Sequence, residues 1–178
     1  MRSTFNIEAG FRYISTQYEI NRKKLSLRMK WVYYEAFDKI PPHILYGLLK
    51  LRQDVFIIEQ DCIYEDIDNL DQHSSQLVLS EADTVIGCAR LVPPGVKYPE
   101  LSIGRIAVSS SYRNRGIGKE LVERAIGIAE KSGQNTIRIE AQTYLLTFYE
   151  SLGFEADGDE YILDGIPHVE MIRVSMPK

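Results

Sequence analysis

Two arginines and two glycines lie close together in Arg113–Gly118, the part of the sequence that points most directly to chemistry. This segment, Arg-Asn-Arg-Gly-Ile-Gly, comes just before a strongly amphipathic stretch that predicts a helix. The start of a helix has unpaired backbone N–H groups and a positive dipole end, so it attracts anions. Glycine lets an anion approach the backbone closely, and the arginines add positive charge. The segment therefore predicts a pyrophosphate site.

The spacing differs from two common phosphate-binding motifs. A Walker loop requires GxxxxGK[ST] and a dinucleotide fingerprint requires GxGxxG, and neither occurs in the sequence. An ordinary surface turn with two solvated arginines is the alternative interpretation of the segment. Which interpretation holds depends on the elements around it.

Hydrophobic periodicity predicts the elements that would position this segment. The first strands follow one another as a meander, and a strand–helix–strand unit comes after them. This order predicts an α/β fold in which a mixed sheet has helices on both faces. The expected strands are 31–36, 76–80, 85–92, 101–108, 136–141, 161–163 and 168–174, and the expected helices are 42–56, 116–131 and 144–152.

The strand 101–108 has a break in its alternation. Leu101 and Ile103 are in phase with each other, but Ile106 and Val108 resume one position out of phase. The slip falls at 104–105, beside a glycine. A one-residue slip of this kind predicts a β-bulge.

Composition and charge limit the classes of function. The chain has 178 residues, 44% of them hydrophobic, which predicts one core. Residues 1–30 contain seven basic and two acidic side chains and carry a charge of +5. The net charge of the chain is −4, so the remaining residues carry −9. An acidic body argues against a nucleic acid and favours a cationic partner. Cys62 and Cys88 lack metal-ligand spacing, so we expect no metal. No apolar run suits a membrane span or a signal peptide, so we expect a cytoplasmic protein with no membrane partner.

Two motifs resemble those of the GNAT N-acetyltransferases. Residues 106–108, Ile-Ala-Val, followed by Arg-x-x-Gly-x-Gly at the start of a helix, resemble motif A of that family. Residues 148–154, Phe-Tyr-Glu-Ser-Leu-Gly-Phe, resemble its second motif, in the expected order and at the expected separation. The resemblance covers roughly residues 43–174. It is closer still to ElaA-like members, through 51–64 (Leu-Arg-x-x-Val-Phe-x-x-Glu-Gln-x-Cys-x-Tyr) and 164–168 (Asp-Gly-Ile-Pro-His).

The resemblance implies a fold and an activity. The fold would be a mixed, mostly antiparallel sheet with helices on both faces and a central splay between two parallel strands. Residues 29–178 would form the acetyltransferase domain, and residues 1–28 an N-terminal extension. The protein would transfer acetyl from acetyl-CoA to a primary amine by direct attack. A non-catalytic acyl-CoA sensor is the alternative, and the oligomeric state stays open, a homodimer included.

The resemblance also implies residues that bind the cofactor. The backbone of 106–108 would pair with pantetheine like an added strand. Gln142 takes the place where many members have an asparagine that contacts pantetheine. The complete implied set is Ile106, Ala107, Val108, Arg113, Asn114, Arg115, Gly116, Ile117, Gly118 and Gln142, with the amides of 113–118 on the pyrophosphate.

Tyr149 is the implied general acid, which would protonate the departing thiolate. A phenol suits this role because its reference pKa of about 10 lies above that of a thiol. Helical spacing alone also fits a core tyrosine. For the base, Glu140, Glu59 and His168 are candidates, as is a chain of water molecules, because an amine of pKa about 10.4 must lose a proton before it attacks. Glu59 and His168 are also expected on the substrate side.

Six carboxylates lie within residues 59–71. The pattern resembles an EF-hand loop only superficially, since the central glycine is missing. A solvated loop is one interpretation. The other is the mouth of a cleft that attracts a cationic amine. The carboxylates are Glu59, Asp61, Glu65, Asp66, Asp68 and Asp71.

Overall fold

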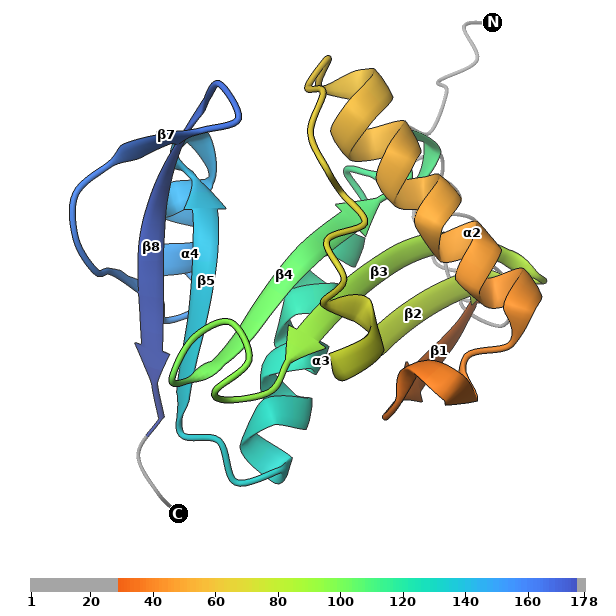
Figure 1. The fold of residues 1–178 in the computed structure, drawn as a ribbon, viewed down its shortest axis with the longest axis horizontal. Helices are drawn as coiled ribbons and strands as arrows, with labels where there is room; N and C mark the ends of the chain where they lie inside the picture. Colours follow the sequence, from red (N-terminus) through yellow and green to blue (C-terminus); the bar gives the residue numbers. More distant parts are fainter. Residues whose placement is uncertain (1–28, 176–178) are drawn as a thin grey trace, which may run out of the picture.

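The structure, a computed structural model, describes residues 29–175, so the expected extension 1–28 lies outside the described residues. The fold is one mixed sheet with the strand order β1-β2-β3-β4-β5-β8-β6, and β7 pairs with β8 (Figure 1). The strands are β1 (Met29–Tyr34), β2 (Ser75–Glu81), β3 (Thr84–Val92), β4 (Leu101–Val108), β5 (Thr136–Gln142), β6 (Glu155–Ala156), β7 (Tyr161–Leu163) and β8 (Ile166–Val174). The helices are α2 (Pro42–Arg52), α3 (Ile117–Lys131) and α4 (Leu146–Glu150), and a π-helix, Gln53–Glu59, continues α2.

The sheet is antiparallel throughout except at its centre. β4 and β5 run parallel and pair only at Leu101 with Ile137 and at Ser102 with Arg138. Beyond Ser102 the two strands part, as Figure 1 shows. The predicted mixed sheet with a splay between two parallel strands is therefore confirmed.

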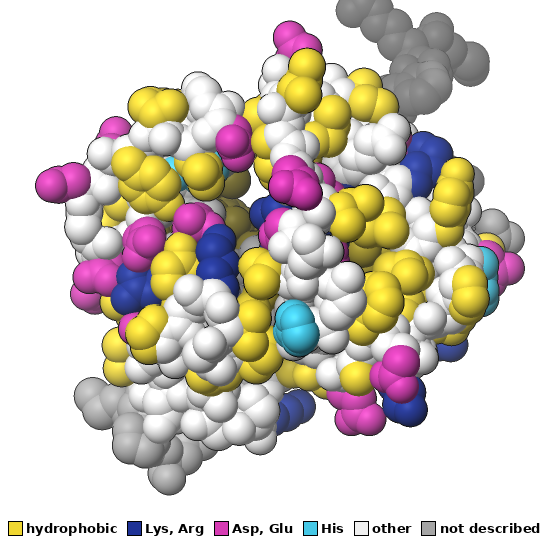
Figure 2. Space-filling model, in the orientation of Figure 1, with side chains coloured by type: hydrophobic (Ala, Val, Ile, Leu, Met, Phe, Trp, Pro, Cys, Tyr) yellow, Lys and Arg dark blue, Asp and Glu magenta, His cyan; other side chains and the backbone are white. Residues whose placement is uncertain are grey.

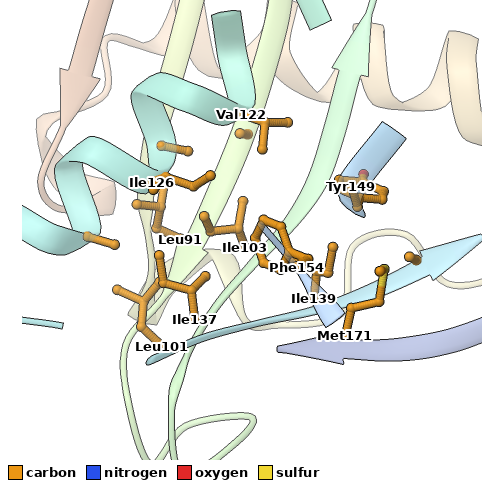
Figure 3. Close-up of a cluster of buried hydrophobic side chains, with 14 of the residues drawn as sticks. Leu91, Leu101, Ile103, Val122, Ile126, Ile137, Ile139, Tyr149, Phe154 and Met171 are labelled. Carbon is orange, nitrogen blue, oxygen red and sulfur yellow. The ribbon is translucent and has the colours of Figure 1, made fainter. Parts of the chain in front are cut away.

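Helices cover both faces of the sheet, as predicted. The apolar face of α3 packs on one side, where Leu121, Val122 and Ala125 are fully buried against strand residues such as Ile103 and Ile137 (Figure 3). Full burial of one Leu or Val side chain stabilises a fold by about 1.5–3 kcal/mol.

On the other side, α2 places Ile44, Leu48 and Leu51 against Val78 and Val85. Strand residues alternate between the two clusters, since Leu77 belongs to the first and Val78 to the second. The sheet is thus held from both sides, which fixes where β4 and β5 part.

Some boundaries differ from the sequence prediction. The first helix changes at Gln53 into a π-helix, whereas 3.6-residue spacing predicted one helix to residue 56. The predicted helix 144–152 is a 3-10 turn, Thr143–Leu145, followed by α4. β6 was missed because two residues are too short for an alternation to be seen. In the described part of the chain, no helix has the length and apolarity to cross a membrane.

Candidate active site

A cavity of about 720 Å³ opens where β4 and β5 part. Its walls come from the π-helix and the chain after it, from β4 and β5, from α4, and from the β7–β8 hairpin. Most of the site residues predicted from the sequence line it: Ile106, Ala107, Val108, Arg113, Glu59, Glu140, Gln142, Tyr149 and His168. Segments far apart in the sequence therefore meet at the splay.

The predicted bulge forms the wall of this cavity on β4. In the β3–β4 pairing Cys88 faces Ala107, but Arg90 faces Gly104, so β4 contains one extra residue. Arg105 has φ +51°, in the left-handed region that non-glycine residues rarely adopt. A bulge bends its strand and leaves ladder groups unpaired. The backbone of 106–108 therefore lies along the cavity, where an extended chain could pair with it.

The helix start predicted to bind anions has the required form. Gly116 is the N-cap of α3 with φ +80°, and Asn114 also has a positive φ, of 59°. No side chain in the described part of the chain caps this helix. A Cβ atom built at Gly116 or Gly118 would meet nothing within 4 Å. The start of α3 is thus uncapped by side chains and has room beside its two glycines.

The two arginines of this segment have protein partners. Arg113 donates from Nε to the Val108 carbonyl (3.0 Å) and through both terminal nitrogens to Glu59, with Nη2 to Oε2 at 2.8 Å. Arg115 donates to the Ser111 carbonyl at 2.9 Å. The hydrogen bonds from Arg113 lower the pKa of Glu59. Glu59 therefore stays a carboxylate and links the π-helix to the segment 113–118.

Tyr149 lies on α4 and is 6% exposed. Its ring packs edge-on against Phe148 and Phe154, at centroid distances of 5.0 and 5.9 Å, and also lines the cavity. Burial, followed by the charge of Tyr144, raises its pKa to about 12. Tyr149 is thus a core ring that also lines the cavity, and its phenol remains protonated at neutral pH.

Glu140 projects from β5 into an ion pair with Lys97 and accepts a hydrogen bond from Tyr161 at 3.0 Å. Burial alone would raise the pKa of this carboxyl, but the hydrogen bond and charge of Lys97 outweigh burial and the pKa is lowered. Glu140 is consequently a carboxylate that holds a proton poorly.

His168 lies opposite Gln142 in the β5–β8 ladder and stacks on Tyr161. Its Nδ1 is 2.8 Å from the Ile166 carbonyl, which can only accept, so Nδ1 carries the hydrogen. Gln142 donates to the Gln60 side chain at 3.3 Å, which ties the end of β5 to the chain after the π-helix.

Three of the six carboxylates in the acidic segment fit neither interpretation. Asp66 and Asp71 are buried rather than solvated, and they bind Arg52 at 2.9 and 2.8 Å. Asp68 binds Arg90 at 2.6 Å. These three carboxylates are neutralised inside the protein and cannot act as a free acidic mouth. Figure 2 shows acidic and basic side chains interspersed on the face it displays.

Sequence patterns did not predict the contacts that two residues of the site make, Lys97 and Cys62. Lys97 comes from the irregular β3–β4 connection, where no periodicity marks it. Cys62 donates from Sγ to the Asp164 carbonyl at 3.2 Å and joins the chain after the π-helix to the β7–β8 hairpin. Both partners of each contact are far apart in the sequence. Only the fold brings them together.

Similar proteins agree with this fold. A family model described as an acetyltransferase (GNAT) domain matches residues 48–174. A UPF0039 protein of Synechocystis sp. is 37% identical over 141 residues, which cover 78% of this chain and 92% of that protein. ElaA of Escherichia coli is 33% identical over 132 residues, covering 72% and 86%. The crystal structure of an acyl-CoA N-acyltransferase from Pseudomonas aeruginosa matches with a TM-score of 0.78 and 32% identity over 82% of this chain and 99% of that one. The chain thus belongs to the GNAT acetyltransferases, is an acyltransferase, and has ElaA among its relatives.

Proposed function

We propose that this acyltransferase moves an acetyl group from acetyl-CoA to a cationic primary amine, by direct attack in a ternary complex. The observation that carries the proposal is the position of Tyr149, a protonated phenol in the wall of the same cavity as the bulged strand. A thioester is already activated, so a site that holds both reactants together needs no covalent enzyme intermediate.

Acetyl-CoA fits the residues present. The open space at Gly116 and Gly118 and the uncapped amides of α3 suit a pyrophosphate. The backbone of 106–108 would pair with the pantetheine amides, and Gln142 lies further along the cavity wall. Tyr149 would give its proton to the sulfur as the thiolate leaves.

For the base, the pairing of the candidates favours His168. Glu59 and Glu140 are each bound to a cation, and the pKa of each is lowered. His168 instead donates from Nδ1 to Ile166, which leaves Nε2 as the ring nitrogen available to an acceptor amine. We assign His168 to take the amine proton, directly or through water, and Glu140 to hold the ammonium before it is deprotonated.

A cationic acceptor is supported by the charges around the cavity. Its lining contains five carboxylates, against Lys97, Arg105 and Arg113. Three of these carboxylates have ion-pair partners, but Glu65 and Asp164 have none in the described part of the chain. We expect Glu65 and Asp164 to attract the cationic amine, a role that the buried carboxylates of the acidic segment cannot fill.

A panel of amines and peptides incubated with acetyl-CoA, with free thiol as the readout, tests this function. We expect thiol release with cationic primary amines and an N-acetyl product by mass spectrometry. Tight binding of acetyl-CoA without turnover on any amine would contradict catalysis and favour an acyl-CoA sensor. A neutral or anionic preferred acceptor would contradict only the assignment of charge.

A further inference from the structure

The cavity wall on β4 is joined to a buried network of three arginines and three aspartates. Arg52 comes from α2, Arg90 from β3 and Arg105 from the bulge of β4, whereas the aspartates all belong to the chain between the π-helix and β2. The ion pairs join Arg52 to Asp66 and Asp71, Arg90 to Asp68 and Asp71, and Arg105 to Asp66 and Asp68. Equal numbers of opposite charges make the network neutral, which burial requires.

Arg105 differs from the other two arginines in its backbone. Its φ of +51° is disfavoured for a residue with a Cβ atom, and such a conformation persists only when the surroundings impose it. Arg52 belongs to α2 and Arg90 to a strand, so regular structure fixes their backbones. The backbone of Arg105 must be fixed by contacts of another kind.

Those contacts come from the side chain of Arg105. Nε lies 2.7 Å from Asp66 Oδ1, a charge contact whose angle does not meet hydrogen-bond geometry. Nη2 donates to the Asp66 carbonyl at 3.2 Å and to Asp68 Oδ2 at 3.1 Å, and the guanidinium lies over the Tyr64 ring at 5.4 Å. Arg52 and Arg90 in turn hold Asp66 and Asp68 in place. The anchor is therefore rigid.

We propose that Arg105 is a positioning residue, whose clamp on Asp66 and Asp68 imposes the bulge and so directs the backbone of Ile106 into the cavity. Arg105 touches neither reactant in this account and acts through the strand. The clamp also couples the chain after the π-helix, which lines one side of the cavity, to β4 on the other. Its effect on turnover rests on the proposed function, but its effect on the strand does not.

Two variants separate the clamp from simple stabilisation. Arg105→Ala and Arg105→Gly delete the same ion pairs, but glycine adopts a positive φ without steric cost. We expect the Kd for CoA to rise about tenfold in the alanine variant, as misplaced binding groups predict. In the glycine variant only backbone entropy opposes the bulge, so a rise of about threefold is expected. Thermal unfolding measures any loss of stability that both variants share.

A ligand-free measurement completes the test. The amide chemical shift and hydrogen exchange of Ile106 should change clearly in Arg105→Ala and little in Arg105→Gly. Arg124→Ala is the matched control, because Arg124 also pairs with a carboxylate, Glu120, and stacks on an aromatic ring, Trp31, but does not line the cavity. Equal changes in both Arg105 variants, or no change at Ile106, would overturn the inference. A wild-type protein that does not bind CoA would instead overturn the proposed function, and the Ile106 signal would still decide the inference.

Discussion

Tyr149→Phe is the change that isolates the proposed acid. It removes one hydroxyl and keeps the ring, whose contacts with Phe148 and Phe154 are made by its edges and faces. The core should therefore survive, and the melting temperature should stay close to that of the wild type. Tyr149→Ala is unsuitable, because emptying a buried aromatic site costs about 3–5 kcal/mol.

The expected loss is one of rate. A positioned acid contributes about 100-fold, which corresponds to about 2.7 kcal/mol of barrier. Because the pKa of Tyr149 is raised to about 12, the phenol is protonated throughout the range below pH 10. The loss in kcat should therefore be the same at every pH below about 10.

Steady-state kinetics with a free-thiol readout measures this loss, and calorimetry checks that acetyl-CoA still binds. Tyr144→Phe serves as the control, since Tyr144 also lines the cavity but is 71% exposed. If Tyr149→Phe turns over at the wild-type rate while chemistry limits kcat, the hydroxyl gives no proton and Tyr149 is a core residue only.

Three further predictions concern binding, acceptor charge and acid stability. Gly118→Glu should fold normally, because a Cβ atom at this position meets nothing within 4 Å and an acidic residue suits the start of a helix. Calorimetry should show that CoA binding is weakened by about 100-fold in this variant. The control Gly118→Ala should change CoA binding little. Replacing Glu65 and Asp164 by their amides should raise the KM for a cationic amine by about fivefold at low salt and less at high salt, whereas Asp83→Asn, in the distant β2–β3 turn, should not. For Asp68, burial alone would raise the pKa, but the hydrogen bonds and charge of its arginine partners outweigh burial and lower the pKa to about 2. Because the pKa of this carboxyl in the folded protein lies below 3.8, Asp68 stabilises the fold above about pH 4. Its contribution of about 2 kcal/mol to the free energy of unfolding should be lost as the pH falls towards 2. Chemical denaturation across that range measures this loss, which Asp68→Asn should not show.

Local features of the fold could be predicted from the sequence because their causes are local. The slip between Ile103 and Ile106 marks the bulge, since alternation records which face each strand residue occupies. Gly116 marks the start of α3 because few other residues adopt its φ of +80°. The same local rules predicted a meander followed by a strand–helix–strand unit.

The ionic network and the Lys97–Glu140 pair could not be predicted in this way. Asp66 and Arg105 are 39 positions apart, and Lys97 and Glu140 are 43 apart, so composition shows the charges without their partners. A run of carboxylates therefore suggested solvent or a cationic ligand, whereas arginines from α2, β3 and β4 neutralise three of them. The π-helix escaped detection because it differs from an α-helix in its i→i+5 hydrogen bonds, which a short apolar pattern does not record.

A crystal structure of the protein with acetyl-CoA and a non-reactive amine analogue tests the central claim most directly. We predict the pyrophosphate on the amides of 113–118, the pantetheine along 106–108, and the Tyr149 hydroxyl within hydrogen-bond reach of the sulfur, about 3 Å. The amine should lie between His168 and Glu140. Acetyl-CoA bound elsewhere, or a thioester beyond the reach of Tyr149, would contradict the assignment of this cavity as the active site.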